Sequence, residues 1–200
     1  MAPHVSYTQA RRLCFELPVW LDDYSQQYRS SPDRDVRMAF VIEAARLNVL
    51  HRSGGPFAAA VFDSADGALL GLGVNLVTNQ GLSMLHAEMV ALALAQRKTG
   101  SYDLGSTGDS VRELLSSTEP CAMCLGAIPW SGIRRLVLAA RDADARRIGF
   151  DEGNKPSDWQ ADLSRRGIEV FTEVQRRAAV SVLDFYVTSG GHLYNGRSRF

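Results

Sequence analysis

The stretch TEPCAMC at residues 118–124 places two cysteines, Cys121 and Cys124, three positions apart and directly after a proline. Proline is well tolerated at the start of a helix, so we expect a helix to begin here. The exposed N–H groups at a helix N-terminus favour the thiolate form of cysteine, which is the form that binds metal. A second short stretch, HAE at residues 86–88, adds a histidine and a carboxylate at the start of another predicted helix. Together the two stretches predict one metal site.

Zinc is the metal that this set of side chains favours. His86, Cys121 and Cys124 are nitrogen and sulfur ligands of the kind that zinc binds tetrahedrally, and a catalytic zinc keeps one position open for water. Zinc lowers the pKa of that water to about 7, so hydroxide becomes available at neutral pH. Glu88 could accept a proton from the water and deliver it to a leaving group. We therefore expect one Zn2+ per chain, with a bound water or hydroxide, and Glu88 as a catalytic residue.

Each stretch also fits a simpler role. An HAE sequence can be the solvated first turn of a helix, and a lone Cys-x-x-Cys can be a redox pair or half of a structural zinc site. A closed structural site needs a fourth ligand. The remaining cysteine, Cys14, lies in the N-terminal segment, and no further histidine has a recognisable ligand spacing. A structural zinc protein, in which Glu88 would be dispensable, is therefore the weaker alternative.

Hydrophobic periodicity around these stretches predicts alternating helices and strands. Helices are expected over residues 33–51, 86–97, 121–130, 142–147 and 174–187 and around Leu163, and strands over 57–62, 68–74, 111–116, 135–140 and 168–171. Such alternation is typical of a sheet covered by helices on both faces. We expect an N-terminal extension over residues 1–32, one α/β domain over 33–188 and a C-terminal tail over 189–200.

Composition restricts the class of protein. The chain has 200 residues, of which 46% are hydrophobic and 22% charged, as in an ordinary globular domain. Its 22 basic and 22 acidic residues cancel, which argues against a nucleic-acid partner, since cations supply most non-specific affinity for phosphates. We see no apolar run of the ~20 residues that cross a bilayer and no secretory signal. With an odd number of cysteines, we expect a cytoplasmic protein without membrane contact.

The pattern H-x-E followed by P-C-x-x-C is typical of zinc deaminases. Over about residues 35–155 the chain resembles the cytidine deaminase-like superfamily, and it is most similar to bacterial guanine deaminases. The resemblance implies an α/β fold, a three-layer α/β/α sandwich with a mixed five-stranded sheet. It also implies zinc ligation by His86, Cys121 and Cys124, proton transfer by Glu88, and a homodimer.

Several flanking stretches resemble the guanine branch of this superfamily: GGPF at 54–57, Asn75, CLGAI at 124–128, Trp130 and GFDE at 149–152. The resemblance implies substrate contacts from Phe57, Asn75, Ala87, Trp130, Asp151 and Phe200, and a second catalytic acid at Glu152. Simpler roles exist for Phe57 in the core, for Asn75 as a cap and for Trp130 beneath a helix. The chain also departs from the guanine pattern, because Glu152 stands where that pattern has an aspartate and reaches about one methylene further.

The C-terminal tail, residues 189–200, has two interpretations. A glycine pair followed by Tyr194 and Phe200 could be a hinged lid over the pocket, with the two rings as anchors. A mobile terminus is the alternative.

These observations lead to one expected function and two alternatives within the same chemistry. We expect a zinc-dependent hydrolytic deaminase that removes an exocyclic amine from a purine base or nucleoside, a small-molecule amino-heterocycle, and releases ammonia. One alternative is a cytosine, cytidine or other amino-heterocycle deaminase. The other is a tRNA- or DNA-editing deaminase, for which Arg197 and Arg199 offer the candidate basic contacts near the pocket.

Overall fold

A mixed five-stranded sheet forms the centre of the protein. The structure is a computed structural model that describes residues 9–105 and 110–196. The strands are β1 (Ala58–Asp63), β2 (Leu69–Val74), β3 (Arg112–Thr118), β4 (Arg135–Ala140) and β5 (Glu169–Phe171), in the order β2-β1-β3-β4-β5. Strand β1 is antiparallel to both β2 and β3, whereas β3, β4 and β5 run parallel. The expected mixed sheet of five strands is confirmed.

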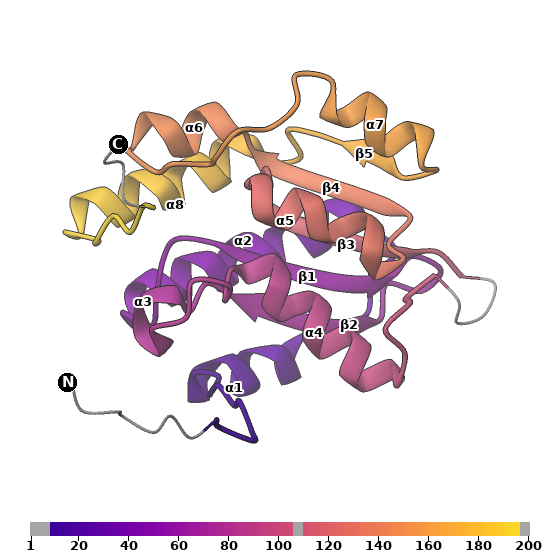
Figure 1. The fold of residues 1–200 in the computed structure, drawn as a ribbon, viewed down its shortest axis with the longest axis horizontal. Helices are drawn as coiled ribbons and strands as arrows, with labels where there is room; N and C mark the ends of the chain where they lie inside the picture. The colour runs from indigo at the N-terminus through magenta and orange to yellow at the C-terminus, as the bar shows by residue number, and fades with distance from the viewer. Residues whose placement is uncertain (1–8, 106–109, 197–200) are drawn as a thin grey trace, which may run out of the picture.

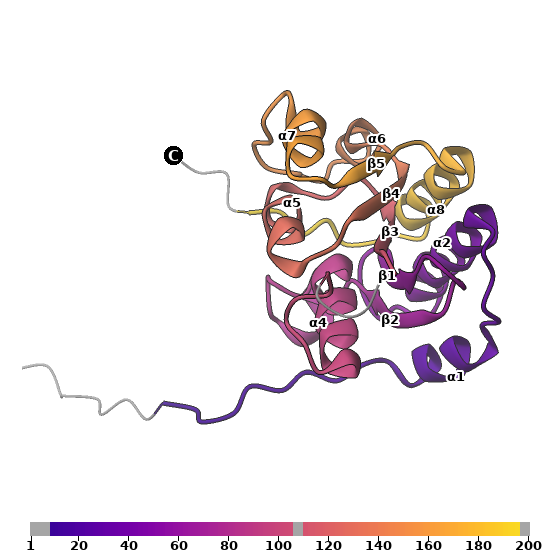
Figure 2. The ribbon, with the colours of Figure 1, turned by 90° about the vertical axis from the view of Figure 1, so that its right-hand side faces the viewer.

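Helices cover both faces of this sheet. Helices α2 (Arg34–Leu50) and α8 (Arg176–Thr188) lie on one face, and α4 (Ala87–Thr99) and α5 (Ala122–Ala127) lie on the other (Figures 1 and 2). Along β1, Ala60 and Phe62 pack into the first of the two cores, and Ala59 and Val61 into the second. Successive side chains of a strand point to opposite faces, so a strand buried on both faces is apolar throughout. The predicted three-layer sandwich is confirmed.

Shorter elements connect these layers, and they are the part of the fold that periodicity predicts least well. They are α1 (Val19–Gln27), α3 (Val77–Gln80), the 3₁₀ helix η1 (Ile128–Ser131), α6 (Asp142–Arg147) and α7 (Trp159–Arg165). The helix predicted over residues 121–130 is in fact α5 followed by η1, because Pro129 has no N–H to continue the α-helical ladder. No helix among residues 9–105 and 110–196 is both long and apolar enough to cross a membrane.

Part of the predicted N-terminal extension belongs to the packed structure. Leu21 of α1 is buried, and the Tyr24 ring stacks on the ring of Phe40 with centroids 4.6 Å apart. The Tyr28 hydroxyl then donates a hydrogen bond to the Gly67 carbonyl at 2.8 Å. Residues 19–28 of the expected extension thus pack against the domain that follows them. The apolar residues of this segment have their partners on α2 and the β1–β2 turn, which is information that no local window of sequence contains.

Helix α4 lies unusually close to β2, and glycines make this possible. A Cβ atom built on Gly73 would stand 2.4 Å from the Ala87 carbonyl oxygen and 2.4 Å from the Ala91 nitrogen, and one on Gly71 would stand 2.6 Å from the Ala91 carbonyl oxygen. These distances are shorter than any Cβ contact, so side chains at Gly71 and Gly73 would push the helix outward. Because α4 begins at Ala87, this packing fixes where His86 and Glu88 lie.

A buried ion pair joins α2 to the middle of the sheet. Arg37 and Glu113 approach to 2.6 Å, with side chains 4% and 0% exposed, and Arg135 lies 3.7 Å from the second carboxylate oxygen of Glu113. Arg37 also donates a hydrogen bond to the Ser31 carbonyl at 2.7 Å. The pair thus connects the segment before α2, the helix itself and β3.

Replacing Arg37 with methionine should lower the free energy of unfolding by about 3 kcal/mol, because the Glu113 carboxylate would lose its main partner while remaining buried. Urea unfolding followed by circular dichroism measures this change. The matched control is Arg46→Met in the same helix, whose pair with Glu43 is 43% and 41% exposed. Arg46→Met should lower the free energy of unfolding by less than about 1 kcal/mol. Equal losses in the two variants would contradict the role of the buried pair.

Candidate metal and catalytic site

Three potential ligands meet where α4 and α5 begin. His86 is the N-cap of α4, Cys121 is the N-cap of α5, and Cys124 lies in the first turn of α5. Their ligand atoms all lie within 4.8 Å of one another, and His86 Nδ1 is 3.4 Å from Cys121 Sγ. Tetrahedral zinc with ordinary Zn–N and Zn–S bonds separates such atoms by about 3.5 Å. The ligand group therefore fits zinc, as the sequence predicted, and Cys14 is exposed and outside it.

Before any metal binds, Cys121 is the thiolate and Cys124 keeps its proton. The Cys124 thiol donates a hydrogen bond that lowers the pKa of Cys121 to about 4. The same hydrogen bond, together with burial, raises the pKa of Cys124 above its ordinary value. One thiolate is thus present at neutral pH. Binding of a divalent cation would release the second proton, because zinc binds the thiolate form of both residues.

Glu88 lies beside the ligand group in the first turn of α4. Its side chain is buried, and burial raises the pKa of its carboxyl group. The Ser116 hydroxyl on β3 donates to Glu88 Oε1 over 3.4 Å. A raised pKa makes the protonated form of a carboxyl group easier to reach, and a proton-transfer residue has to pass through that form.

A cavity of about 40 Å³ lies against this group. Seven of the predicted site residues line it: His86, Glu88, Cys121, Glu152, Phe57, Asn75 and Asp151. Four more residues complete the wall: Thr118, Glu119, Phe150 and Tyr194. The sequence contained partial signals for these four, since two belong to TEPCAMC, one to GFDE, and Tyr194 is the first aromatic residue of the tail.

Two predicted substrate contacts, Ala87 and Trp130, are not among the residues that line this cavity. Trp130 is 85% exposed on η1, which follows the end of α5 at Ala127. The Ala87 side chain packs in the core between α4 and the sheet, next to Ala91. Phe200 lies outside the described residues.

The cavity has an aromatic wall built from three separate segments. Phe57 precedes β1, Phe150 follows α6, and Tyr194 comes from the C-terminal tail. The Phe57 and Phe150 rings meet edge to face with centroids 4.9 Å apart, and the Phe150 and Tyr194 rings do so at 5.2 Å. Flat aromatic rings prefer such surroundings, so the wall suits a planar heterocycle.

Several polar groups face the cavity without a protein partner. The hydroxyl groups of Thr118 and Tyr194 are buried and accept or donate no hydrogen bond within the described part of the chain. Asn75 is 1% exposed, and its Oδ1 accepts a hydrogen bond from the Val77 N–H at 3.2 Å, so its NH2 group can donate to a bound molecule. A buried polar group without a partner costs about 1–3 kcal/mol. A ligand or water that satisfied these groups would recover that energy.

Glu152 is the second carboxyl group of the cavity. Burial, reinforced by the negative charges of Cys121 and Glu88, raises the pKa of Glu152 to about 8. Two carboxyl groups with raised pKa values at one cavity mark a site of proton transfer. The pair can therefore handle protons at two positions of a bound ring, one beside the ligand group and one away from it.

The C-terminal tail crosses the loop that carries Glu152. Asn195 Oδ1 accepts a hydrogen bond from the Asp151 N–H, and Asn195 Nδ2 donates one to the Gly149 carbonyl, each at 2.9 Å. The Tyr186 hydroxyl of α8 donates to the His192 carbonyl at 2.6 Å. These bonds hold Tyr194 in the wall of the cavity.

Comparison with known proteins places this site among the zinc deaminases. Residues 32–140 match the family model of the cytidine and deoxycytidylate deaminase zinc-binding region. The chain is 34% identical to the guanine deaminase of Bacillus subtilis (strain 168) over 141 residues, which cover 70% of this chain and 76% of that protein. It is also similar to the solved structure of a guanine deaminase from Nitrosomonas europaea, with a TM-score of 0.86 and 42% identity over 91% of this chain and 100% of that one. A further similar structure, with a TM-score of 0.84 and 44% identity over 90% of this chain and 95% of that one, is a complex with 2,6-diaminopurine.

Replacing Cys121 with alanine should abolish stoichiometric zinc binding, because two protein ligands hold the ion poorly. We expect the affinity to fall by more than the 10- to 100-fold that changes around the ligands typically cause. Atomic absorption after gel filtration measures the zinc content per chain. Cys14→Ala is the matched control and should keep the full zinc content. Retention of one zinc per chain by Cys121→Ala would mean that the ligands are misassigned.

Proposed function

The chain belongs to the family of the cytidine and deoxycytidylate deaminase zinc-binding region, and from this premise we propose that it is a guanine deaminase-like enzyme, a zinc-dependent hydrolase that removes the exocyclic amine of a purine. The observation that carries the proposal is the shared cavity. It joins a His–Cys–Cys ligand group, two carboxyl groups of raised pKa and an aromatic wall. These are the parts that hydrolytic deamination of a flat ring requires.

The reaction exchanges a C–N bond of the ring for a C–O bond. Zinc, when bound by His86, Cys121 and Cys124, supplies the activation of a water molecule. Glu88 accepts one proton from this water and passes it to the adjacent ring nitrogen, and it then transfers the second proton, from the newly added hydroxyl group, to the departing amine. The amine leaves as ammonia, and the ring keeps the oxygen. Burial of Glu88 supports this role, because it raises the pKa of the carboxyl group and so favours the uptake of a proton that is later passed on.

Three further groups support a purine as the substrate. We assign Asn75 to a hydrogen bond with the purine edge, Phe57 to packing against its face, and Glu152 to the N–H group that lies beyond the reach of Glu88. The 2,6-diaminopurine bound in a similar structure supports a purine over a pyrimidine. Asp151, which lines the cavity, is a further proposed substrate contact, and Ala87, Trp130 and Phe200 stay proposals from the sequence.

The C-terminal tail is proposed to act as a lid, which favours a small molecule over a nucleic acid. A cavity of about 40 Å³ is far smaller than the 300–1,000 Å³ of typical small-molecule pockets. A purine needs more room than this cavity offers, so we propose that Tyr194 moves aside with the tail as a base enters and that the tail closes again over it. A base that is still part of a polynucleotide would leave its strand in the path of residues 192–196.

We also propose a homodimer in the cytoplasm. The 85% exposed Trp130 and the 40% exposed Met123 lie on η1 and α5, beside the ligand group, and both would be better covered by a second copy of the chain. The cysteines are free thiols, as a reducing compartment maintains them. Sedimentation at micromolar concentration tests the dimer, and a monomer alone would contradict it.

Zinc-loaded protein should release ammonia from guanine, and the conservative variant Glu88→Gln should lower kcat by about 10²- to 10⁴-fold while keeping its zinc. The measurement compares guanine, guanosine, adenine, adenosine, cytosine and cytidine in a coupled ammonia assay. Release from pyrimidines alone would keep the chemistry but overturn the roles of Asn75 and Glu152. Full activity of Glu88→Gln would exclude Glu88 from proton transfer.

Replacing Asn195 with alanine should lower kcat/KM by about 30-fold, because the lid would lose two hydrogen bonds worth about 1 kcal/mol each. The control is Asn154→Ala. Asn154 is exposed in the loop that carries Glu152, and this variant should retain activity. Faster removal of the tail by a protease in Asn195→Ala would show that the hydrogen bonds hold it closed. Equal kcat/KM values for the two variants would contradict the lid.

A further inference from the structure

The Glu152 carboxyl group depends on its backbone for its position. Within the described residues, no side chain donates a hydrogen bond to this carboxyl group. The Glu152 carbonyl accepts a hydrogen bond from the Ala122 N–H, at 2.9 Å, in the first turn of α5. Residues 149–155, here called the Glu152 loop, contain no helix or strand. Whatever fixes this loop therefore fixes the second carboxyl group of the cavity.

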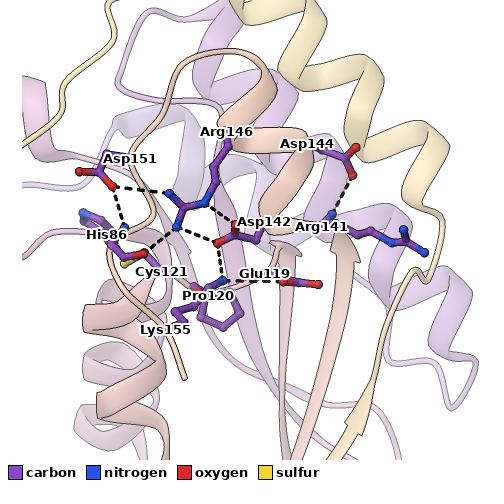
Figure 3. Close-up of polar contacts among 11 residues, drawn as sticks. His86, Glu119, Pro120, Cys121, Arg141, Asp142, Asp144, Arg146, Asp151 and Lys155 are labelled. Carbon is purple, nitrogen blue, oxygen red and sulfur yellow. Dashed lines mark hydrogen bonds and ion pairs between the residues drawn. The ribbon is translucent and has the colours of Figure 1, made fainter. Parts of the chain in front are cut away.

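Lys155, three positions after Glu152, ties this loop to two other segments (Figure 3). Its ammonium group donates to the Pro120 carbonyl at 3.0 Å and lies 2.6 Å from Asp142 and 3.7 Å from Glu119. Glu119 and Pro120 directly precede the ligand Cys121, and Asp142 begins α6. One side chain thus links the loop, the ligand segment and the end of β4.

The burial of Lys155 distinguishes it from the neighbouring cation. Its side chain is 8% exposed, whereas that of Arg146 is 42% exposed. Arg146 holds the loop as well, because it donates to the Gly153 carbonyl at 2.6 Å and pairs with Asp142 and Asp151. Exposed pairs are screened by water and contribute little, while a buried ammonium with several partners is held firmly. The rigid link is therefore the one that Lys155 makes.

We propose that Lys155 is a positioning residue for deamination: its ammonium group locks the Glu152 loop to the Pro120–Cys121 segment and so keeps the Glu152 carboxyl group aimed into the cavity opposite Glu88. The proposal rests on the proposed function, since it concerns the geometry of that reaction. Lys155 does not line the cavity, so it acts on the reaction through the segments that it holds, and the double-mutant cycle below separates an effect through Glu152 from one through the ligand segment. Displacing a catalytic group by about 1 Å can cost as much as 100-fold in rate.

The experiment is a double-mutant cycle on zinc-loaded protein. Lys155→Met removes the charge and keeps the length of the side chain. We expect it to lower kcat for guanine by about 10- to 100-fold with KM changed less than about threefold, because the loss falls on the reacting geometry. Lys155→Arg should restore most of this loss. In a Glu152→Gln background, Lys155→Met should lower kcat by less than about a further twofold, because the effects of residues that act as one unit are not additive.

Two controls make the outcome decisive. Lys98 lies at the C-terminal end of α4, far from the ligand group, and donates a hydrogen bond to the Leu69 carbonyl of β2. Lys98→Met should leave kcat unchanged. Asp142→Asn weakens the same link from α6, so it replaces Lys155→Met in the cycle should that variant fail to fold or to keep its zinc. A kcat for Lys155→Met equal to that of Lys98→Met, or losses that multiply in the double variant, would overturn the positioning role while the deaminase activity stands. Absence of ammonia release by the unsubstituted protein would instead overturn the proposed function, and this role with it.

Discussion

The close packing of α4 on β2 is the constraint on which the rest of the site depends. Helix α4 carries both His86 and Glu88 at its start, and it lies where Gly71 and Gly73 leave no side chains beneath it. The ligand cysteines stand on α5, on the same face of the sheet. A helix pushed outward by even one methyl group would move His86 away from Cys121, although the two ligand atoms must lie about 3.5 Å apart around a zinc ion.

Charge is distributed in two zones around this packing. The cavity itself contains a thiolate and two buried carboxyl groups. Burial and the Cys121 thiolate raise the pKa of both carboxyl groups, Glu88 raises that of Glu152 further, and the cations lie in the loop behind the cavity. Such an arrangement attracts a divalent cation to the ligand group and leaves protons available at Glu88 and Glu152. It also explains how a chain of zero net charge can have a strongly polarised site.

The second carboxyl group of the cavity takes its position from contacts on both sides of its loop. Lys155 holds one side of the loop and so fixes the backbone from which the Glu152 side chain extends. Asn195 holds the other end of the same loop and couples it to the tail. The second carboxyl group is therefore set by contacts from α6 and the tail as much as by its own identity.

The sequence by itself determined the metal-ligand group, the carboxyl group beside it and the alternation of strands and helices, because short motifs and periodicity are local properties. It did not reveal that α1 packs on α2, that Trp130 is exposed on η1, or that Thr118 and Lys155 lie beside the site, and it left open whether Tyr194 covers the pocket or belongs to a mobile tail. Tyr24 and Tyr28 depend on Phe40 of the next helix, whereas Tyr194 depends on Phe150 and Lys155 on Pro120, 44 and 35 residues away along the chain. Only the tertiary structure decided them, since burial and hydrogen bonding between distant segments exist only once the sheet has brought those segments together.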